Sequence, residues 1–386
     1  MRKIRYPPSG SQKKNPPLAA LLLALLLSHS VCAEPLYSPT WGFKIDLPEE
    51  FYYIEGDGRD RFSFESQEGS AFDIAIYPGG VYRSAAELGE DVQRRLGNRG
   101  SSTSFTYRNK EAVLMELSFI NPLSRLPCEG WGLCVELEGE GPKPLLLALV
   151  YGNLGIERLQ SLYFSALDSI SPGPEDRLAP GPITEYAYPR GERRFVPVAN
   201  TNVQAWISPG DSEAAQALVD REFAVLARYV SHPAWQEAWK RFYRAIYRDS
   251  YDRLKDIAFN LERSWSAQGD IPGEALKWVQ SFAYERDLMG SDFVNLVSAA
   301  VEGRGDCDSR AMLWAICVSQ ANIPTAMMVS RELGHAMGLV DSSGPGARFE
   351  MDGRQWLVAE TTAQVALGLI AAQYSNSELW LGISFE

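Results

Sequence analysis

A proline-dense segment in the middle of the chain separates two different sequence patterns. Residues 171–192 contain five prolines and scattered glycines, a composition typical of a semi-extended linker. Short runs of alternating apolar residues precede this segment, and runs with apolar residues every three or four positions follow it. Since 386 residues are enough for two domains, we expect an α+β protein with one domain at 34–170, a helical segment at 193–264 and a second domain at 265–386.

The first domain carries the pattern of an antiparallel sheet with helices packed against it. Helical spacing occurs at 84–96, where Ser84 is a candidate N-cap, and at 156–167. The alternating runs that predict strands are 42–47, 61–65, 71–77, 103–107, 112–119 and 144–151.

Two stretches at the ends of this domain resemble the PsbP/Mog1-like family. They are Gly42–Pro48, which reads GFKIDLP, and Ser165–Pro172, which reads SALDSISP. The resemblance implies a small α/β/α sandwich. No cluster of chemically active residues occurs within this domain, so we expect a binding or spacer module rather than a catalytic one.

The first 33 residues have the pattern of a secretory signal. Five basic residues without an acidic one precede the apolar run Leu18–Leu27, and small residues occupy the positions before a cleavage site after Ala33. Ten apolar residues are too few to span a bilayer, so no membrane-spanning segment is expected once the signal is removed. A lipid anchor on Cys32 is a less favoured alternative, because the residues before it do not suit a lipobox. We therefore expect a secreted, periplasmic or cell-envelope protein.

The net charge of the chain without its predicted signal indicates which binding partners are disfavoured. Removal of residues 1–33 leaves 32 basic and 49 acidic residues, a formal net charge of −17. Such an acidic surface disfavours nucleic acid and anionic membranes as partners. The sequence does not indicate an oligomeric state.

Cys128 and Cys134 are separated by five residues, and an oxidising compartment favours a local disulfide between them. The alternative is two free thiols in a loop. Metal binding is less favoured, because no histidine or further cysteine lies near them in the sequence. Cys317 lies in the middle of an apolar helical run and is interpreted as core packing.

Cys307 is the candidate nucleophile. Gly303 and Gly305 allow a tight loop, Asp306 is a candidate N-cap, and a helix-favouring run follows from Ser309. A cysteine at a helix N-terminus is favoured as a thiolate, and its own backbone N–H can help to bind an oxyanion. The alternative is a buried apolar cysteine at the start of a core helix.

A cysteine nucleophile needs an imidazole base and a group that orients it. His232 precedes a proline and is interpreted as a helix-entry residue, which leaves His335, at the start of a predicted strand. A hairpin turn at Asp352-Gly353 lets the returning strand place Glu360 beside His335 in one register. Asp352 is an alternative acid, but the turn itself explains its presence.

These residues occur in the order that is typical of the transglutaminase-like superfamily, which the sequence resembles. The matching stretches are Gly305–Ala311, Ala321–Pro324, Gly334–Ala336 and Trp356–Thr362, with Trp278–Tyr284 as the helix that precedes the nucleophile. The resemblance covers about a quarter of the chain, from Trp265 to Thr362, and implies a papain-like fold in which Glu360 stands where the family usually has Asp. Gln280 is a candidate oxyanion donor, with an exposed helix glutamine as the alternative.

The resemblance implies an exported cysteine enzyme that forms a thioester with a protein or peptide substrate. Hydrolysis of a peptide or isopeptide bond, as in a cysteine protease or amidase, is the first expectation, and protein-glutamine transamidation is the alternative within the same chemistry. A catalytically inactive cell-envelope scaffold is the alternative from another class. Neither a cofactor nor a metal is expected, since no phosphate-binding loop and no metal-ligand spacing occurs in the sequence.

Overall fold

The computed structural model describes residues 35–153, 156–286 and 293–385. The predicted signal segment 1–33, with the alternative lipid anchor at Cys32, lies outside the described residues. In the part of the chain that is described, none of the helices combines the length and apolar character needed to cross a membrane.

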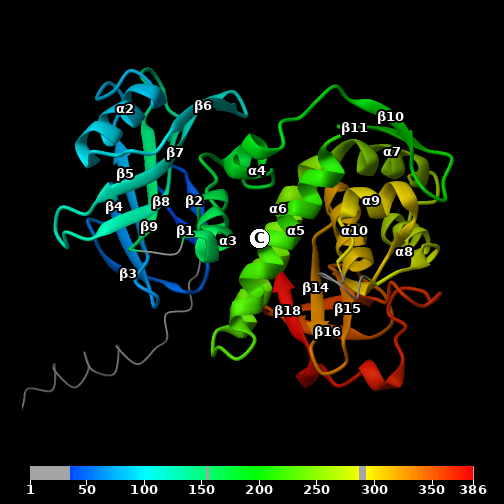
Figure 1. The fold of residues 1–386 in the computed structure, drawn as a ribbon. Helices are drawn as coiled ribbons and strands as arrows, with labels where there is room; N and C mark the ends of the chain where they lie inside the picture. The colour runs from blue at the N-terminus through cyan, green and yellow to red at the C-terminus, as the bar shows by residue number, and fades with distance from the viewer. Residues whose placement is uncertain (1–34, 154–155, 287–292, 386) are drawn as a thin grey trace, which may run out of the picture. The chain divides into compact units, whose positions relative to one another are not determined.

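A seven-stranded antiparallel sheet forms the core of the N-terminal half (Figure 1). Its strand order is β3-β4-β5-β9-β8-β7-β6, so that β3 and β6 lie at the edges. The strands are β3 (Phe51–Gly56), β4 (Arg61–Ser66), β5 (Ala71–Tyr77), β6 (Ser102–Tyr107), β7 (Lys110–Ile120), β8 (Pro127–Glu136) and β9 (Leu145–Gly152).

Both faces of this sheet are covered by a helix, because apolar residues alternate between its two sides. Val113 and Met115 pack in one cluster with α2 (Ala85–Leu96), whose first turn is capped by Ser84 as predicted. Ala112 and Leu114 pack in another cluster with α3 (Ile156–Asp168). The two helices and the sheet form the expected α/β/α layers, and the α+β fold class is confirmed.

The two stretches that resemble the PsbP/Mog1-like family lie side by side. Lys44, in β2 (Lys44–Ile45), exchanges backbone hydrogen bonds of 3.0 and 2.8 Å with Ser171. β2 also pairs with β1 (Leu36–Tyr37). The beginning and the end of this half are thereby joined through the backbone.

The prediction of a semi-extended linker at 171–192 is wrong. The segment contains η1 (Pro174–Asp176) and α4 (Pro182–Ala187), and many of its residues are buried. The guanidinium of Arg248, from a helix far along the chain, donates hydrogen bonds of 2.9 to 3.1 Å to three backbone carbonyls around the segment: those of Asp168, Ile170 and Ala179. These long-range contacts, which proline content does not reveal, fold the segment onto the protein.

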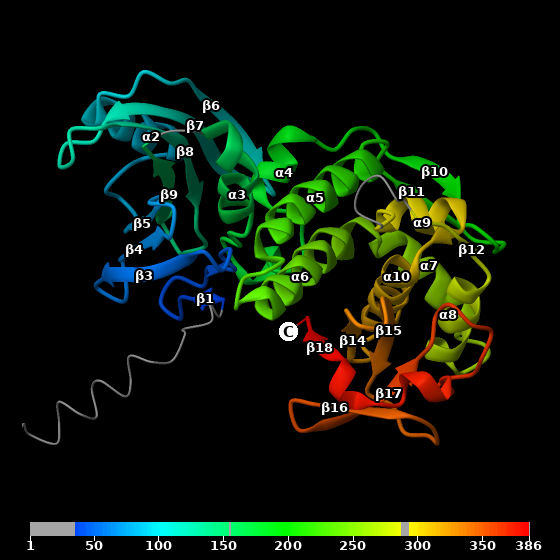
Figure 2. The ribbon, with the colours of Figure 1, turned by 60° about the horizontal axis from the view of Figure 1, so that its bottom comes forward.

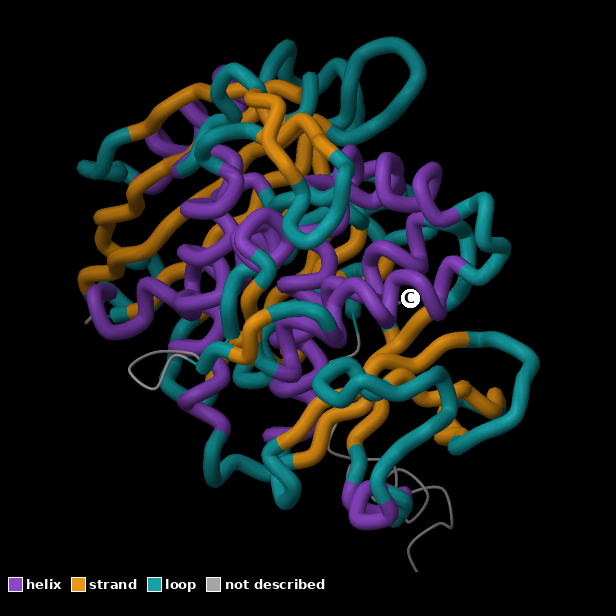
Figure 3. The backbone as a smooth tube through the Cα atoms, turned by 90° about the vertical axis from the view of Figure 1, so that its right-hand side faces the viewer, coloured by secondary structure: helices purple, strands orange, loops and turns teal. Residues whose placement is uncertain are grey.

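A group of helices follows, and Figure 3 shows helices gathered between two groups of strands. The predicted helical segment 193–264 begins instead with a hairpin of β10 (Arg194–Pro197) and β11 (Gln204–Ile207). The helices are α5 (Asp211–Leu226), η2 (Ala227–Tyr229), α6 (Trp235–Arg253), α7 (Lys255–Trp265), α8 (Ile271–Gln280), α9 (Leu296–Glu302) and α10 (Cys307–Gln320).

The C-terminal half contains a five-stranded antiparallel sheet of order β16-β17-β15-β14-β18. Helix α10 packs on one face of this sheet (Figure 2), and an apolar cluster that includes Met337 and Trp356 lines the other face. The strands are β14 (Thr325–Ser330), β15 (His335–Val340), β16 (Arg348–Met351), β17 (Arg354–Ala359) and β18 (Leu381–Ser384), and short 3-10 turns η3 (Ala372–Tyr374) and η4 (Ser377–Leu379) precede the last strand.

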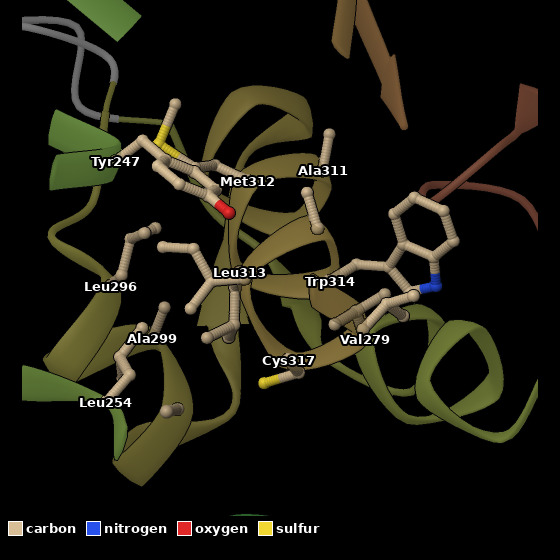
Figure 4. Packing of buried hydrophobic residues seen from close by; sticks show 14 of the residues in the cluster. Tyr247, Leu254, Val279, Leu296, Ala299, Ala311, Met312, Leu313, Trp314 and Cys317 are labelled. Atoms are coloured by element: carbon tan, nitrogen blue, oxygen red, sulfur yellow. The ribbon is translucent and has the colours of Figure 1, made fainter. Parts of the chain in front are cut away.

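The core of this half surrounds α10, which is buried along most of its length (Figure 4). Trp314 is fully buried, and a Cβ on Gly338 in β15 would lie 2.3 Å from its ring. Gly338 therefore allows the helix to approach the sheet closely. Cys317 is 1% exposed, and burial raises its pKa to about 12, as expected for a core thiol.

The predicted disulfide between Cys128 and Cys134 is also wrong, since both thiols are free and buried. Both residues lie in β8, where a six-residue separation corresponds to roughly 20 Å. A disulfide requires Cα atoms roughly 4.4–6.8 Å apart. The extended strand thus keeps the two sulfurs apart.

Candidate active site

The loop before α10 places Cys307 at a helix start. Helix α9 ends at Gly303, whose φ of 69° is left-handed, and β13 (Arg304–Gly305) then pairs in parallel with β12 (Ala283–Tyr284). Asp306 is the N-cap, and its carboxylate accepts a hydrogen bond of 2.8 Å from the Ser309 N–H. Cys307 is consequently the first residue of α10, as predicted.

The surroundings of Cys307 differ from the expected thiolate environment. Its side chain is 2% exposed, and its thiol donates to Oδ2 of Asp308 at 3.4 Å. Burial raises the thiol pKa, and so do the carboxylates of Asp308 and Asp306, while the N–H of Ala336 lowers it by a smaller amount. These surroundings favour the neutral thiol, in contrast to the predicted helix-stabilised thiolate.

A tyrosine from another helix fixes the carboxylate beside the thiol. The hydroxyl of Tyr243, in α6, donates a short hydrogen bond to Oδ1 of Asp308. Tyr243 is 6% exposed, and burial followed by the Asp308 charge raises its pKa well above its ordinary value. Tyr243 is therefore a neutral donor that holds Asp308 next to Cys307.

His335 is held by a carboxylate and by aromatic rings. Its Nε2 lies 2.8 Å from Oε2 of Glu360, while Nδ1 has no hydrogen bond to any residue that the structure describes. The ring stacks on Tyr374 with centroids 4.8 Å apart and meets Trp380 edge-on at 6.2 Å. One ring nitrogen is thus anchored and the other is available for proton transfer.

Glu360 directly follows β17 and faces His335 because β17 pairs with β15, with Ala359 opposite Gly338. Its Oε1 accepts hydrogen bonds of 2.7 Å from both the backbone N–H and the hydroxyl of Thr362. Burial opposes ionisation of Glu360, but the hydrogen bonds and charge of its partners outweigh burial and lower its pKa. An ionised carboxylate at this position keeps the His335 ring in one orientation.

The three predicted residues meet at one end of the five-stranded sheet. The N–H of Ala336, the residue after His335, is directed at the Cys307 sulfur. Within residues 35–153, 156–286 and 293–385, no hydrogen bond joins Cys307 to His335 itself, since the thiol donates to Asp308. The structure therefore shows an anchored histidine next to a cysteine whose proton is held elsewhere.

Gln280 does not act as the predicted oxyanion donor in this structure. Its amide nitrogen donates to the carbonyls of Glu360 and Val365 at 2.8 and 2.9 Å, which uses both amide hydrogens. The side chain is 8% exposed, so it is not an exposed helix glutamine either. Its role is to hold the segment after Glu360 against α8.

Asp308, Tyr243 and the N–H of Ala336 were not predicted from the sequence. Asp308 directly follows Cys307 in the sequence, and a negative charge beside a candidate nucleophile is the feature that could have identified it. Tyr243 lies 65 residues away from Asp308 along the chain, and no local pattern marks it. The Ala336 contact depends on how α10 packs on β15, which only the folded chain reveals.

A cavity of about 530 Å³ lies between α8 and the segment 364–367. Gln280 forms part of its wall, and Val365 and Leu367 line the opposite side. Both polar and apolar side chains line this cavity, and Cys307, His335 and Glu360 are not among them.

One group of carboxylates has the spacing of a metal site, far along the chain from Cys307. Potential ligand atoms of Glu138, Glu175 and Asp176 lie within 4.8 Å of one another. However, Nζ of Lys110 lies 2.9 Å from Glu175 and 3.0 Å from Asp176. The ammonium group already supplies the positive charge that these carboxylates need.

A scan against protein-family models finds no match, and a search of curated proteins finds none either. Among solved structures, the chain is similar to LpqN, described as involved in cell envelope biogenesis of Mycobacterium tuberculosis, with 11% identity over 34% of this chain and 84% of that chain and a TM-score of 0.25. It is also similar to a protein from Bacteroides thetaiotaomicron, with 8% identity over 84% of this chain and 89% of that chain and a TM-score of 0.26. Both TM-scores are too low for the similarity to carry an argument about fold or function.

Proposed function

We propose that the protein is an exported, transglutaminase-like cysteine enzyme that hydrolyses a peptide or isopeptide bond. The observation that carries this proposal is the anchored His335, with Nε2 on Glu360 at 2.8 Å and Nδ1 unbonded among the described residues. Cys307 at a helix start, in contact with the N–H of the residue after His335, supports it further. Export rests on the pattern of the first 33 residues.

In this mechanism Nδ1 of His335 removes the thiol proton as the Cys307 sulfur attacks the amide carbonyl carbon. Backbone N–H groups at the start of α10 stabilise the resulting oxyanion. His335 then donates the proton to the leaving amine, and a thioester forms. Water resolves the thioester in a hydrolase, whereas a second amine would resolve it in a transamidase.

A second candidate is a binding scaffold that has kept the fold without catalysis. The hydrogen bond from Cys307 to Asp308 favours this candidate, because it keeps the thiol protonated and away from His335. In this case the thiol would react with acylating reagents independently of the histidine.

Acylation by p-nitrophenyl acetate separates the two candidates. The purified full chain would be mixed with the ester, and the acetyl group on Cys307 would be located by peptide mapping and tested for release by hydroxylamine. We expect acetylation of Cys307 to be at least about 100-fold slower in His335→Ala, because general-base catalysis contributes roughly 10²–10⁴-fold. His232→Ala is the matched control and should behave as the wild type. Equal rates in wild type and His335→Ala would leave only the scaffold.

A further inference from the structure

The candidate nucleophile lies in a markedly acidic environment. Asp308 accepts the Cys307 thiol at 3.4 Å, and Asp306 and Glu360 are both buried near the same helix start, at 1% and 3% exposure. Both neighbouring aspartates raise the pKa of the Cys307 thiol. Of these three carboxylates, Asp308 is the partly exposed one, whereas Asp306 and Glu360 are buried.

Arg310, in the same helix as Asp308, makes its hydrogen bonds to backbone carbonyls. Arg310 donates hydrogen bonds to the carbonyls of Gly305 and Phe282 at 3.0 and 2.9 Å. Its guanidinium also stacks over Tyr284, 5.4 Å from the ring centre. Among the described residues no ion pair joins Arg310 to Asp308, whose carboxylate contacts Tyr243 and the Cys307 thiol instead.

Asp308 is also placed more rigidly than a surface carboxylate. Tyr243 donates to one of its oxygens from α6, and the thiol occupies the other. Its side chain is only partly buried, in contrast to Cys307 and Asp306. A fixed, partly accessible carboxylate next to a nucleophile is suited to recognising charge in a substrate.

We propose that Asp308 is a specificity residue that selects a substrate with an ammonium or guanidinium group close to the scissile carbonyl. This inference rests on the proposed function of Cys307 and His335. When the substrate cation pairs with Asp308, the thiol loses its acceptor and its hydrogen turns to Nδ1 of His335. The proton then passes from sulfur to Nδ1 as the sulfur attacks, so binding of the correct substrate activates the nucleophile.

Paired thiol reagents of similar size and opposite charge test the proposal. The probes are the trimethylammonium-ethyl and sulfonato-ethyl methanethiosulfonates, and modification of Cys307 is followed by peptide mapping of the full chain. We expect the ratio of the cationic to the anionic modification rate at Cys307 to be at least about tenfold higher than the same ratio for free cysteine. Asp308→Asn should abolish most of this preference, and Asp341→Asn, at an exposed aspartate just after β15, should leave it unchanged.

A salt series and a Tyr243→Phe variant test the same proposal further. In the wild type, the preference should fall as sodium chloride is added, because salt screens the carboxylate charge. Tyr243→Phe, which removes only the hydroxyl, should reduce the preference by loosening Asp308. A ratio equal to that of free cysteine, or one that persists in Asp308→Asn, would overturn the proposal.

The same assay distinguishes failure of the specificity proposal from failure of the proposed function. His335→Ala should slow modification by both reagents while the preference for the cationic one remains. Loss of preference with retained dependence on His335 overturns only the role of Asp308. Modification that does not depend on His335 contradicts the enzyme, and a Cys307 that reacts with neither reagent contradicts both.

Discussion

At the scale of single residues, the carboxylate of Glu360 determines the orientation of the His335 ring. Glu360 reaches one methylene further than the Asp that the transglutaminase-like resemblance implies, and it still lies 2.8 Å from Nε2. Its second oxygen is held by Thr362 through two hydrogen bonds of 2.7 Å. The Glu360 side chain is therefore held at both of its carboxylate oxygens.

Replacement of Glu360 by Gln should destabilise the protein in a pH-dependent way. The folded pKa of Glu360 lies below its ordinary value of 4.5, so its ionised form stabilises the fold above about pH 4.5 and this stabilisation is lost as the pH falls through the folded pKa. At pH 7 we expect Glu360→Gln to lower the free energy of unfolding by about 2 kcal/mol, typical of hydrogen bonds to charged groups. Urea unfolding at pH 7 and in acid measures both values; a difference that grows in acid would contradict this account.

The site residues illustrate which features the sequence could predict. Cys307, His335 and Glu360 follow from local patterns, namely a helix start, a strand start and the end of a returning strand. The protonation state of Cys307 could not be predicted, because it depends on burial and on a tyrosine from α6. The role of Gln280 likewise depends on which carbonyls the chain brings to it.

At the scale of elements, the contact between α10 and β15 positions the cysteine relative to the histidine. Trp314 packs directly on Gly338, and its indole N–H donates to the carbonyl of Pro272 at 3.0 Å. Trp314 belongs to the helix that begins with Cys307, and Gly338 belongs to the strand that begins with His335. The contact between them therefore sets the position of the helix start relative to the strand start. Any change in it should disturb both stability and the site.

Gly338→Ala should therefore destabilise the protein by about 1–3 kcal/mol, the usual effect of overpacking a core. The added Cβ would lie 2.3 Å from the Trp314 ring, so that the helix or the strand must shift. Thermal unfolding followed by circular dichroism measures the change. Gly191→Ala is the matched control, since a Cβ there meets no atom within 4 Å; equal effects of the two substitutions would count against this role of Gly338.

Elements with strong local patterns were predicted well. The strands β4, β5, β6, β7 and β9 and the caps Ser84 and Asp306 lie where the alternation and capping residues indicated. The hairpin β10–β11 and the folded segment 171–192 were missed, because short strands and proline-rich chain carry a weak local signal. Contacts from Arg248 decide the structure of that segment.

At the scale of the whole molecule, the described residues between 35 and 385 belong to one compact unit. Apolar residues of α5 and α6 belong to the same buried cluster as those of the seven-stranded sheet. Arg241 of α6 adds a buried ionic link: it contacts Glu49, just before β3, at 3.2 Å and Glu222 of α5 at 2.7 Å. The two halves therefore share both an apolar core and a charged cluster.

Removal of Arg241 should strongly destabilise this unit. Arg241→Leu leaves the buried carboxylate of Glu49 without its cation, while Glu222 keeps Arg221 at 2.9 Å, and removal of one partner of a buried pair costs about 3–5 kcal/mol. Adding Glu49→Gln to the variant should restore part of the loss. Denaturant unfolding tests this, with Lys240→Leu as a control at a more exposed neighbour; a loss no larger than that of the control would refute the role of the cluster.

The central claim, that His335 and Asp308 compete for the proton of one thiol, is tested most directly by the pH dependence of Cys307 alkylation. Iodoacetamide would be applied to the wild type, Asp308→Asn, His335→Ala and the double variant, with Cys307 and Cys317 separated by peptide mapping. The wild type should react appreciably only at alkaline pH, because burial and the adjacent carboxylates raise the thiol pKa.

Asp308→Asn should move the onset of alkylation to lower pH, and His335→Ala should abolish most of that shift. This result would show that the histidine acts on Cys307 once the carboxylate is removed. An Asp308→Asn profile that matches the wild type, or one that is unaffected by His335→Ala, would contradict the claim.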